Sequence, residues 1–90
     1  MAGRLVELSP RALRDLGGVP AEAAREVLDD LELLKKTPWP GPPKVKKLRG
    51  HDLYRLRTGE YRSVFEIRGE KVVVLRIVGR KELERVLKSL

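Results

Sequence analysis

Cysteine is absent from this chain of 90 residues, and His51 is its only histidine. Without cysteine there is no disulfide and no thiolate metal site, and the composition is compatible with a reducing compartment. The carboxylates are scattered over predicted helix surfaces, so they suggest no set of metal ligands. There is also no glycine-rich phosphate-binding loop. We therefore expect neither a metal nor a cofactor.

Long apolar runs are missing too. No stretch approaches the roughly 20 apolar residues that a membrane-spanning helix needs, and no signal-peptide core is visible. We expect a soluble, cytoplasmic protein that makes no contact with a membrane. The length is that of one domain, residues 1–90, with a single hydrophobic core.

Charge, by contrast, is abundant and unbalanced. The chain has 20 Lys and Arg residues against 13 Asp and Glu residues, which gives a net charge of +7. An excess of positive charge favours a polyanionic partner, either nucleic acid or an acidic protein segment. The alternative is that the 37% of charged residues simply solvate a small, heat-stable domain. That alternative does not explain why one sign prevails.

The N-terminal half reads as one short strand and two helices. Residues 4–8 suit a strand, and Ser9 followed by proline is a typical helix start, with Leu13 and Leu16 expected on the buried side. A longer helix begins after Pro20. Its apolar side chains recur at the spacing of one buried face, and they are Ala24, Val27, Leu28, Leu31 and Leu34. We expect the two helices to form an antiparallel pair.

A β-hairpin is predicted around Gly59-Glu60, because glycine tolerates the positive φ of a two-residue loop. If the two residues that flank this loop pair with each other, Arg57 lies opposite Arg62, and Arg55 lies opposite Val64. Like charges directly opposite each other destabilise a strand pair, so this arrangement suggests an anionic partner. The core face of the hairpin would then hold Tyr54, Leu56, Ser63, Phe65 and Ile67.

Residues 72–78 are apolar on both sides, as expected of a central strand covered on both faces. The turn before this strand decides where Arg76 points. A two-residue loop places Arg76 on the core face opposite Ser63, whereas a three-residue loop with a bulge places it beside Arg62. The second arrangement is favoured here, because an unpaired buried arginine is costly.

These elements predict an α+β fold in which two N-terminal helices pack on one face of a small antiparallel sheet and a short C-terminal helix follows. All helices are expected on one face. Residues 82–90 form the last helix, and its apolar side chains are Leu83, Val86, Leu87 and Leu90. The proline-rich residues 37–43 form a stiff connector, with Trp39 expected to pack against the body.

Four short motifs occur in order along the second half of the chain: KLRG, LYRLR, G-x-YR and VGRK. Together with the two leading helices they resemble the RelE/ParE superfamily of toxins from toxin–antitoxin pairs, over nearly the whole chain. The resemblance implies a RelE-like fold and one of two activities. RelE-like members are ribosome-dependent endoribonucleases that cut mRNA in the decoding site, and ParE-like members inhibit DNA gyrase. Both kinds are silenced by an antitoxin that wraps the toxin.

The resemblance also suggests which residues act. The family's basic strand positions fall on Arg55 and Arg57, and its G-x-YR arginine falls on Arg62. Lys81 stands where the family has an arginine, and Arg80 where many relatives have histidine. Arginine suits the stabilisation of charge on phosphorus but is a poor general base. We assign Arg57 and Arg62 to transition-state charge, Arg55 to phosphate positioning, and Lys81 to proton transfer or leaving-group stabilisation.

Further cations are candidates for RNA binding, namely Lys44, Lys46, Lys47, Arg49, Arg76 and Arg80. For the run from Lys44 to Arg49 the alternative is an edge strand that lysine protects from aggregation. His51 is expected in a turn rather than in catalysis. The aromatic side chains of the hairpin, Tyr54, Tyr61 and Phe65, are expected in the core rather than stacked on bases.

The leading hypothesis is a toxin that cleaves mRNA on the ribosome and inhibits translation. Its partner would be a RelB-like antitoxin with an acidic, amphipathic segment. The alternatives are a ParE-like gyrase inhibitor without nuclease activity, or a catalytically weakened member that retains antitoxin binding. The arginines of the hairpin favour the first hypothesis. The last helix favours the alternatives, because Arg85 or Leu87 stands where relatives often have tyrosine.

Overall fold

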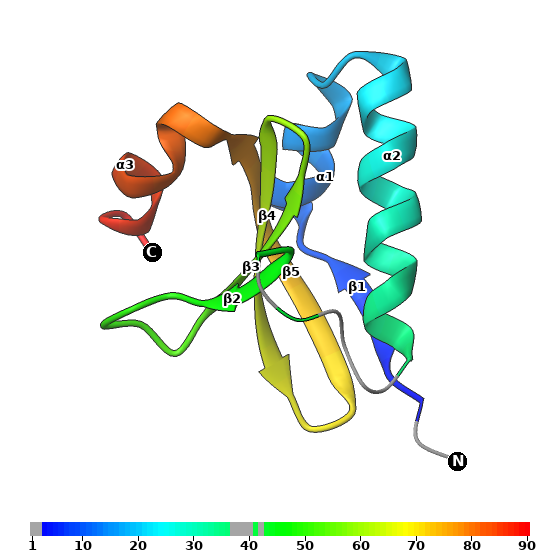
Figure 1. The fold of residues 1–90 in the computed structure, drawn as a ribbon, viewed down its shortest axis with the longest axis vertical. Helices are drawn as coiled ribbons and strands as arrows, with labels where there is room; N and C mark the ends of the chain where they lie inside the picture. Colours follow the sequence, from blue (N-terminus) through cyan, green and yellow to red (C-terminus); the bar gives the residue numbers. More distant parts are fainter. Residues whose placement is uncertain (1–2, 37–40, 42) are drawn as a thin grey trace.

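The computed structural model describes residues 3–36, 41 and 43–90. The chain forms an α+β domain, as predicted, and Figure 1 shows its course. In chain order the elements are β1 (Leu5–Leu8), α1 (Pro10–Gly17), α2 (Ala21–Glu32), the 3-10 turn η1 (Leu33–Lys35), β2 (Val45–Lys47), β3 (Tyr54–Thr58), β4 (Tyr61–Arg68), β5 (Lys71–Gly79), the 3-10 turn η2 (Arg80–Glu82) and α3 (Leu83–Leu87). None of the helices in these described ranges is long and apolar enough to cross a membrane. Trp39 lies outside the described residues.

The sheet has five strands in the order β1-β5-β4-β3-β2. β2 to β5 are antiparallel, as expected, but β1 pairs with β5 in parallel. The prediction of a purely antiparallel sheet is therefore wrong for β1. A parallel neighbour needs a long crossover, and here the two helices and the β2–β4 segment separate the paired strands in sequence. β5 is thus a central strand, with β1 on one side and β4 on the other.

The helices lie on both sides of the sheet (Figure 1). α1 and α2 cover one face, and α3 lies on the other, so the expectation that all helices share one face is wrong for α3. The main core lies under α1 and α2 and contains Ala12, Val27, Leu31, Leu34, Val45, Leu56, Phe65, Val72, Val74 and Ile77. Val64, Val78 and Val86 are also buried but are not part of that cluster, which agrees with a smaller apolar contact beneath α3.

Ser9 starts α1 as predicted: its Oγ accepts a hydrogen bond from the Ala12 amide at 3.0 Å. The buried side of α1 was expected at Leu13, but Leu13 is 57% exposed and Ala12 is fully buried. Asp15 explains this difference, because its carboxylate binds Arg76 and the Ile77 amide of β5, so the side of α1 that carries Asp15 faces the sheet. Residues three apart share a helix face, so Ala12 points inward with Asp15.

In α2 and the turn that follows it, Val27, Leu31 and Leu34 are buried as predicted, whereas Leu28 is exposed, contrary to the prediction. The apolar stripe of α2 is therefore narrower than the sequence suggests. Ile67 is likewise exposed rather than in the core, because it lies near the far end of the β4–β5 hairpin.

The β3–β4 hairpin has the predicted register. Arg57 pairs with Arg62, Arg55 pairs with Val64, and Gly59 has a φ of +57° in the two-residue loop. Cross-strand partners share a face, so the two paired arginines lie on the same side of the sheet. The turn residues alone thus bring like charges together.

Arg76 lies on the side of the sheet that the favoured arrangement predicted, although the loop before β5 has two residues and not three. A bulge after Val74 places Arg76 opposite Val64, on the same face of β4 as Arg62. Its Nε is 2.7 Å from Oδ2 of Asp15, and one terminal nitrogen is 3.3 Å from Oδ1. Asp15 also accepts the amide hydrogen of Ile77 at 3.0 Å. The Arg76 side chain is therefore buried with Asp15 as its partner. Asp15 belongs to α1, and the residue pattern of β5 does not predict which helix residue packs there.

Candidate functional site

Four arginines gather where the β3–β4 hairpin meets the end of β5, and we call Arg55, Arg57, Arg62 and Arg80 the arginine cluster. The hairpin brings the first three together through its register. The amide of Arg80 donates a hydrogen bond of 2.8 Å to the carbonyl of Glu60, which holds the start of η2 against the hairpin loop. Arg80, 18 to 25 positions after the other three arginines, thus shares one surface with them.

Burial and mutual repulsion both lower the pKa of guanidinium groups in the arginine cluster. Burial lowers the pKa of the Arg62 guanidinium; Arg55, Arg57 and Arg80 lower it further by repulsion, and Glu60 opposes them. Burial also lowers the pKa of Arg55, with Arg57 as the second cause. Guanidinium groups remain protonated at physiological pH, so this repulsion persists in the free protein. An anion bound among these side chains would relieve it.

Backbone carbonyls hold two of these side chains in place. Arg55 donates to the carbonyl of Pro43 at 2.8 Å, and Arg62 donates to the carbonyls of Gly59 at 2.8 Å and Tyr61 at 3.0 Å. Arg57 is exposed, and its guanidinium forms no hydrogen bond or ion pair within the described ranges. Arg80 is also exposed and has no side-chain partner in the same ranges, so the cluster combines two held guanidinium groups with two that are available to a ligand.

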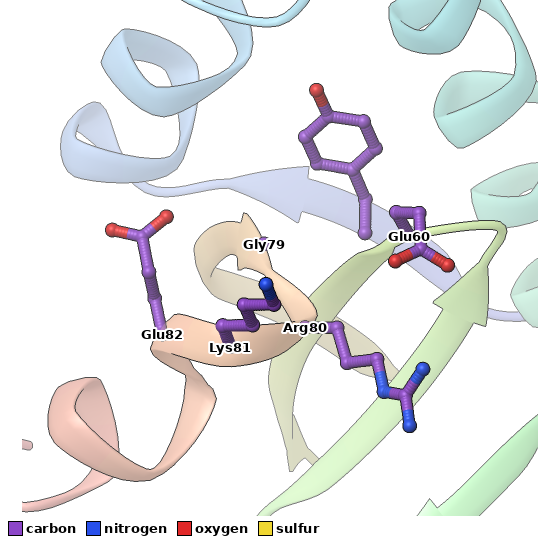
Figure 2. A pocket seen from close by; sticks show the side chains of 6 residues that line it. Glu60, Gly79, Arg80, Lys81 and Glu82 are labelled. Atoms are coloured by element: carbon purple, nitrogen blue, oxygen red, sulfur yellow. The ribbon is translucent and has the colours of Figure 1, made fainter.

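Two shallow hollows flank the cluster. One, of about 300 Å³, is lined by Pro43, Lys44, Arg57 and Gly59. The other, of about 310 Å³, we call the Glu60 pocket; it is lined by Glu60, Tyr61, Gly79, Arg80, Lys81 and Glu82 (Figure 2). Both volumes lie at the lower end of the range for ligand pockets. Lys81, predicted to act in proton transfer, is exposed at the Glu60 pocket.

The basic run around β2 lies on an edge strand, as the second interpretation of Lys44 to Arg49 predicted. Lys44 is bound to Asp30, with Nζ 2.8 Å from Oδ2, and the Thr58 hydroxyl donates to the same oxygen at 2.7 Å. Lys46 and Lys47 are exposed and paired with β3 through the backbone, and Arg49 is exposed beyond them. RNA binding by these side chains stays a prediction.

Arg76 is removed from the RNA-binding candidates. Its side chain is only 16% exposed and is paired with Asp15, which is 14% exposed. A guanidinium group that is buried and already paired with a carboxylate is not available to bind a phosphate. The pair links α1 to β5.

The remaining sequence predictions near the site concern His51 and the aromatic side chains. His51 lies in a turn, as predicted, with its amide donating to the carbonyl of Leu48 at 3.2 Å. Tyr54 stacks on Phe65, with ring centroids 5.5 Å apart, and Tyr54 and Tyr61 pack partly buried against the core. These rings pack in or against the core, as expected, although Tyr61 also lines the Glu60 pocket.

The sequence analysis described the carboxylates as scattered over the surface and did not identify three that have specific positions in the structure. Asp15 and Asp30 bind Arg76 and Lys44, and Glu60 lines a pocket with Arg80. Only the position of Glu60 beside the loop glycine offered a signal in the sequence, since it places the side chain at a hairpin tip. Over the described ranges, no three histidine or acidic side chains come together as a metal site.

Comparison with known proteins agrees with this architecture. Residues 6–84 match the family described as the ParE toxin of type II toxin–antitoxin systems. The chain belongs to this toxin family. It is 30% identical over 80 residues to the protein RelE1 of Methanocaldococcus jannaschii. The matched residues cover 86% of this chain and 89% of the relative. The resemblance to the RelE/ParE superfamily that the motifs suggested is thereby confirmed.

Two solved structures are similar to this toxin over most of both chains. The archaeal RelE–RelB complex of Pyrococcus horikoshii matches with a TM-score of 0.73 and 28% identity, covering 89% of this chain and 97% of the other. The toxin–antitoxin complex RelBE2 of Mycobacterium tuberculosis matches with a TM-score of 0.73 and 26% identity, covering 87% and 99%. The RelE-like fold predicted from the motifs is therefore confirmed.

Proposed function

We propose that this toxin is an endoribonuclease that cleaves mRNA bound to the ribosome, in the cytoplasm, and so inhibits translation. The observation that carries the proposal is the arginine cluster, with Arg57 exposed opposite a fixed Arg62. Support also comes from the relatives of similar sequence, which are named as RelE proteins.

The arginine cluster suits one part of RNA cleavage in particular. Attack of the 2′-oxygen on phosphorus places extra negative charge on the phosphoryl oxygens, and guanidinium groups bind such oxygens through charge-assisted, often bidentate hydrogen bonds. Arg57 and Arg62 would hold this charge, and Arg55 would position the neighbouring phosphate. Lys81, at the rim of the Glu60 pocket, would stabilise the leaving 5′-oxygen or give it a proton.

The shape of the site supports a dependence on the ribosome. The hollows beside the cluster are small and shallow, so they do not enclose a nucleotide or orient it fully. A substrate that is already held in a cleavable geometry removes much of the entropic part of the barrier. The decoding site of the ribosome would supply that geometry.

Primer extension on an mRNA in a translating extract tests the proposal. Added toxin should produce discrete cuts within the translated region, and none on the same mRNA without ribosomes. The variant Arg57→Ala serves as the matched protein control and should leave the mRNA largely intact. Uncut mRNA with wild-type toxin would exclude the proposed activity.

A second function, inhibition of DNA gyrase, is favoured by the match to the ParE family and by the last helix. Residues 83–90 contain no tyrosine, the residue that relatives often carry there. A supercoiling assay with purified gyrase distinguishes the two functions. Inhibited supercoiling with intact mRNA selects the second, and loss of both activities selects a weakened member that only binds its antitoxin.

The proposed partner is a RelB-like antitoxin. Two of the similar structures are complexes with an antitoxin. For this chain, with a net charge of +7, the complementary segment would be acidic and amphipathic, and it would fold on binding. It would cover apolar surface on the helices and shield the arginine cluster from nucleic acid.

A further inference from the structure

The chain contains two hairpin loops of the same sequence, Gly59-Glu60 and Gly69-Glu70. Both glycines have positive φ, +57° and +60°, so the two loops are close in local conformation. Their surroundings differ. The first loop lies at the arginine cluster, whereas the second lies at the other end of β4, where its carbonyl binds the amide of Leu5.

Glu60 is held beside the arginine cluster by its place in the hairpin loop and by one hydrogen bond. It lies between the strands that carry Arg57 and Arg62, and its carbonyl accepts the amide hydrogen of Arg80 at 2.8 Å. Figure 2 shows its carboxylate and the Arg80 guanidinium on the same side of the view, with Lys81 projecting nearer the middle. The influence of Glu60 on the pKa of Arg62 agrees with a carboxylate close to the cluster.

Two carboxylates line the Glu60 pocket, and only one of them is available. Glu82 is bound to Arg85, with oxygen and nitrogen 2.9 Å apart. For Glu60, the described part of the chain provides no cation within ion-pair distance. A carboxylate oxygen that no cation holds is able to accept a proton from a ligand.

The arginine cluster leaves one task of RNA cleavage without a residue. Arginines stay protonated and cannot remove the proton of a 2′-hydroxyl. His51 lies in the turn before β3 and lines a different hollow, next to α3. Among the groups that line the Glu60 pocket, Glu60 alone combines a basic oxygen with the lack of a competing ion pair.

We propose that Glu60 is the general base that takes the proton from the attacking 2′-hydroxyl, an inference that rests on the proposed endoribonuclease function. The 2′-oxygen then bonds to phosphorus, and the bond between phosphorus and the 5′-oxygen breaks. The 5′-oxygen takes a proton from the ammonium group of Lys81. The products are a 2′,3′-cyclic phosphate and a 5′-hydroxyl, and exchange with water returns both side chains to their starting charge.

Single-turnover cleavage of a short mRNA on purified, programmed ribosomes tests this role, with toxin in excess and its concentration varied. Glu60→Gln should lower the maximal rate by about 100- to 10,000-fold, the usual contribution of a positioned base. The toxin concentration at half-maximal rate should stay the same or fall, because the substitution removes a negative charge beside RNA. Glu60→Asp keeps a carboxylate and should be faster than Glu60→Gln.

Glu70→Gln is the matched control, since it makes the same change in the equivalent loop away from the arginine cluster, and it should cleave like the wild type. Three results would overturn the proposal. Glu60→Gln with an unchanged maximal rate, or Glu60→Asp no faster than Glu60→Gln, excludes a base at this position while the endoribonuclease function stands. A wild-type toxin that leaves the ribosome-bound mRNA intact removes both proposals together.

Discussion

At the scale of single residues, Arg57 and Arg62 make the same face of the β3–β4 hairpin cationic. We predict that Arg57→Ala and Arg62→Ala each abolish toxicity without unfolding the protein. Loss of one donor to transition-state charge typically costs about 100- to 1,000-fold in rate. Cleavage by the purified variants measures the loss, and circular dichroism checks the fold.

The control for these variants is Arg68→Ala, an arginine at the other end of β4 from Arg62. It removes the same charge from the same strand and should leave toxicity intact. Growth arrest by folded Arg57→Ala and Arg62→Ala variants at the wild-type level would show that these arginines do not act in catalysis.

Asp15 and Arg76 form an ion pair of a different kind, nearly buried and without a role at the arginine cluster. Asp15→Ala leaves the Arg76 charge and the Ile77 amide without their partner. We predict a loss of roughly 3 kcal/mol in the free energy of unfolding, as is typical when a buried pair is broken from one side. Urea denaturation measures this loss.

Glu7→Ala provides the comparison for Asp15→Ala. Glu7 pairs with Lys71 at 3.0 Å, but both side chains are about half exposed. Such surface pairs contribute about 1 kcal/mol or less. If Asp15→Ala destabilised the protein no more than Glu7→Ala, the Asp15–Arg76 pair would not be what fastens α1 to β5.

At the scale of elements, the Ser9 side chain makes two hydrogen bonds, one that caps α1 and one that joins the start of α1 to the sheet. The hydroxyl accepts from the Ala12 amide and donates to the carbonyl of Leu75, the residue at the bulge of β5, each at 3.0 Å. We predict that Ser9→Ala costs about 1 to 2 kcal/mol in unfolding free energy, because a helix cap and a contact to the sheet are lost together.

Ser89→Ala is the matched substitution, since the Ser89 hydroxyl bonds only locally, to the carbonyl of Val86. We expect this change to lie within about 0.5 kcal/mol of the wild type, as is usual at exposed sites. Thermal unfolding of both variants compares them. Equal stability of the two variants would mean that the Ser9 cap does not hold α1 on the sheet.

At the scale of the whole molecule, the net charge of +7 should govern the encounter with the proposed antitoxin. Opposite charges accelerate association, and salt screens them, with a Debye length that shrinks several-fold between about 50 mM and about 500 mM salt. We predict that the association rate falls steeply over this range. The dissociation rate should change much less, because apolar anchors on the helices control it.

Stopped-flow mixing of toxin and antitoxin at the two salt concentrations measures the association rate. A double variant that removes the exposed charges Lys46 and Lys47 of β2 should show a weaker salt dependence, which assigns part of the effect to that edge. An association rate that is equal at both salt concentrations would show that the basic surface is not what the antitoxin meets first.

Features that arise between neighbours in the chain could be predicted from the sequence alone. Ser9 before proline predicted the start of α1, and the glycine of the Gly59-Glu60 loop predicted a tight turn. That turn sets the register of β3 and β4, so the facing of Arg57 and Arg62 followed from local geometry. These inferences succeed because a cap or a two-residue turn depends on a few adjacent residues.

Features that depend on partners far along the chain required the folded structure. Arg76 pairs with Asp15, 61 residues away. The bulge in β5 that positions Arg76 could not be predicted from the loop before the strand. The same holds for β1 beside β5 and for the Glu60 pocket, where a hairpin tip meets the end of another strand. The alternation of residues along a strand predicts which face of the sheet a side chain lies on. It does not predict which distant helix or loop packs against that face. That outcome is set by how the helices and the sheet pack against each other.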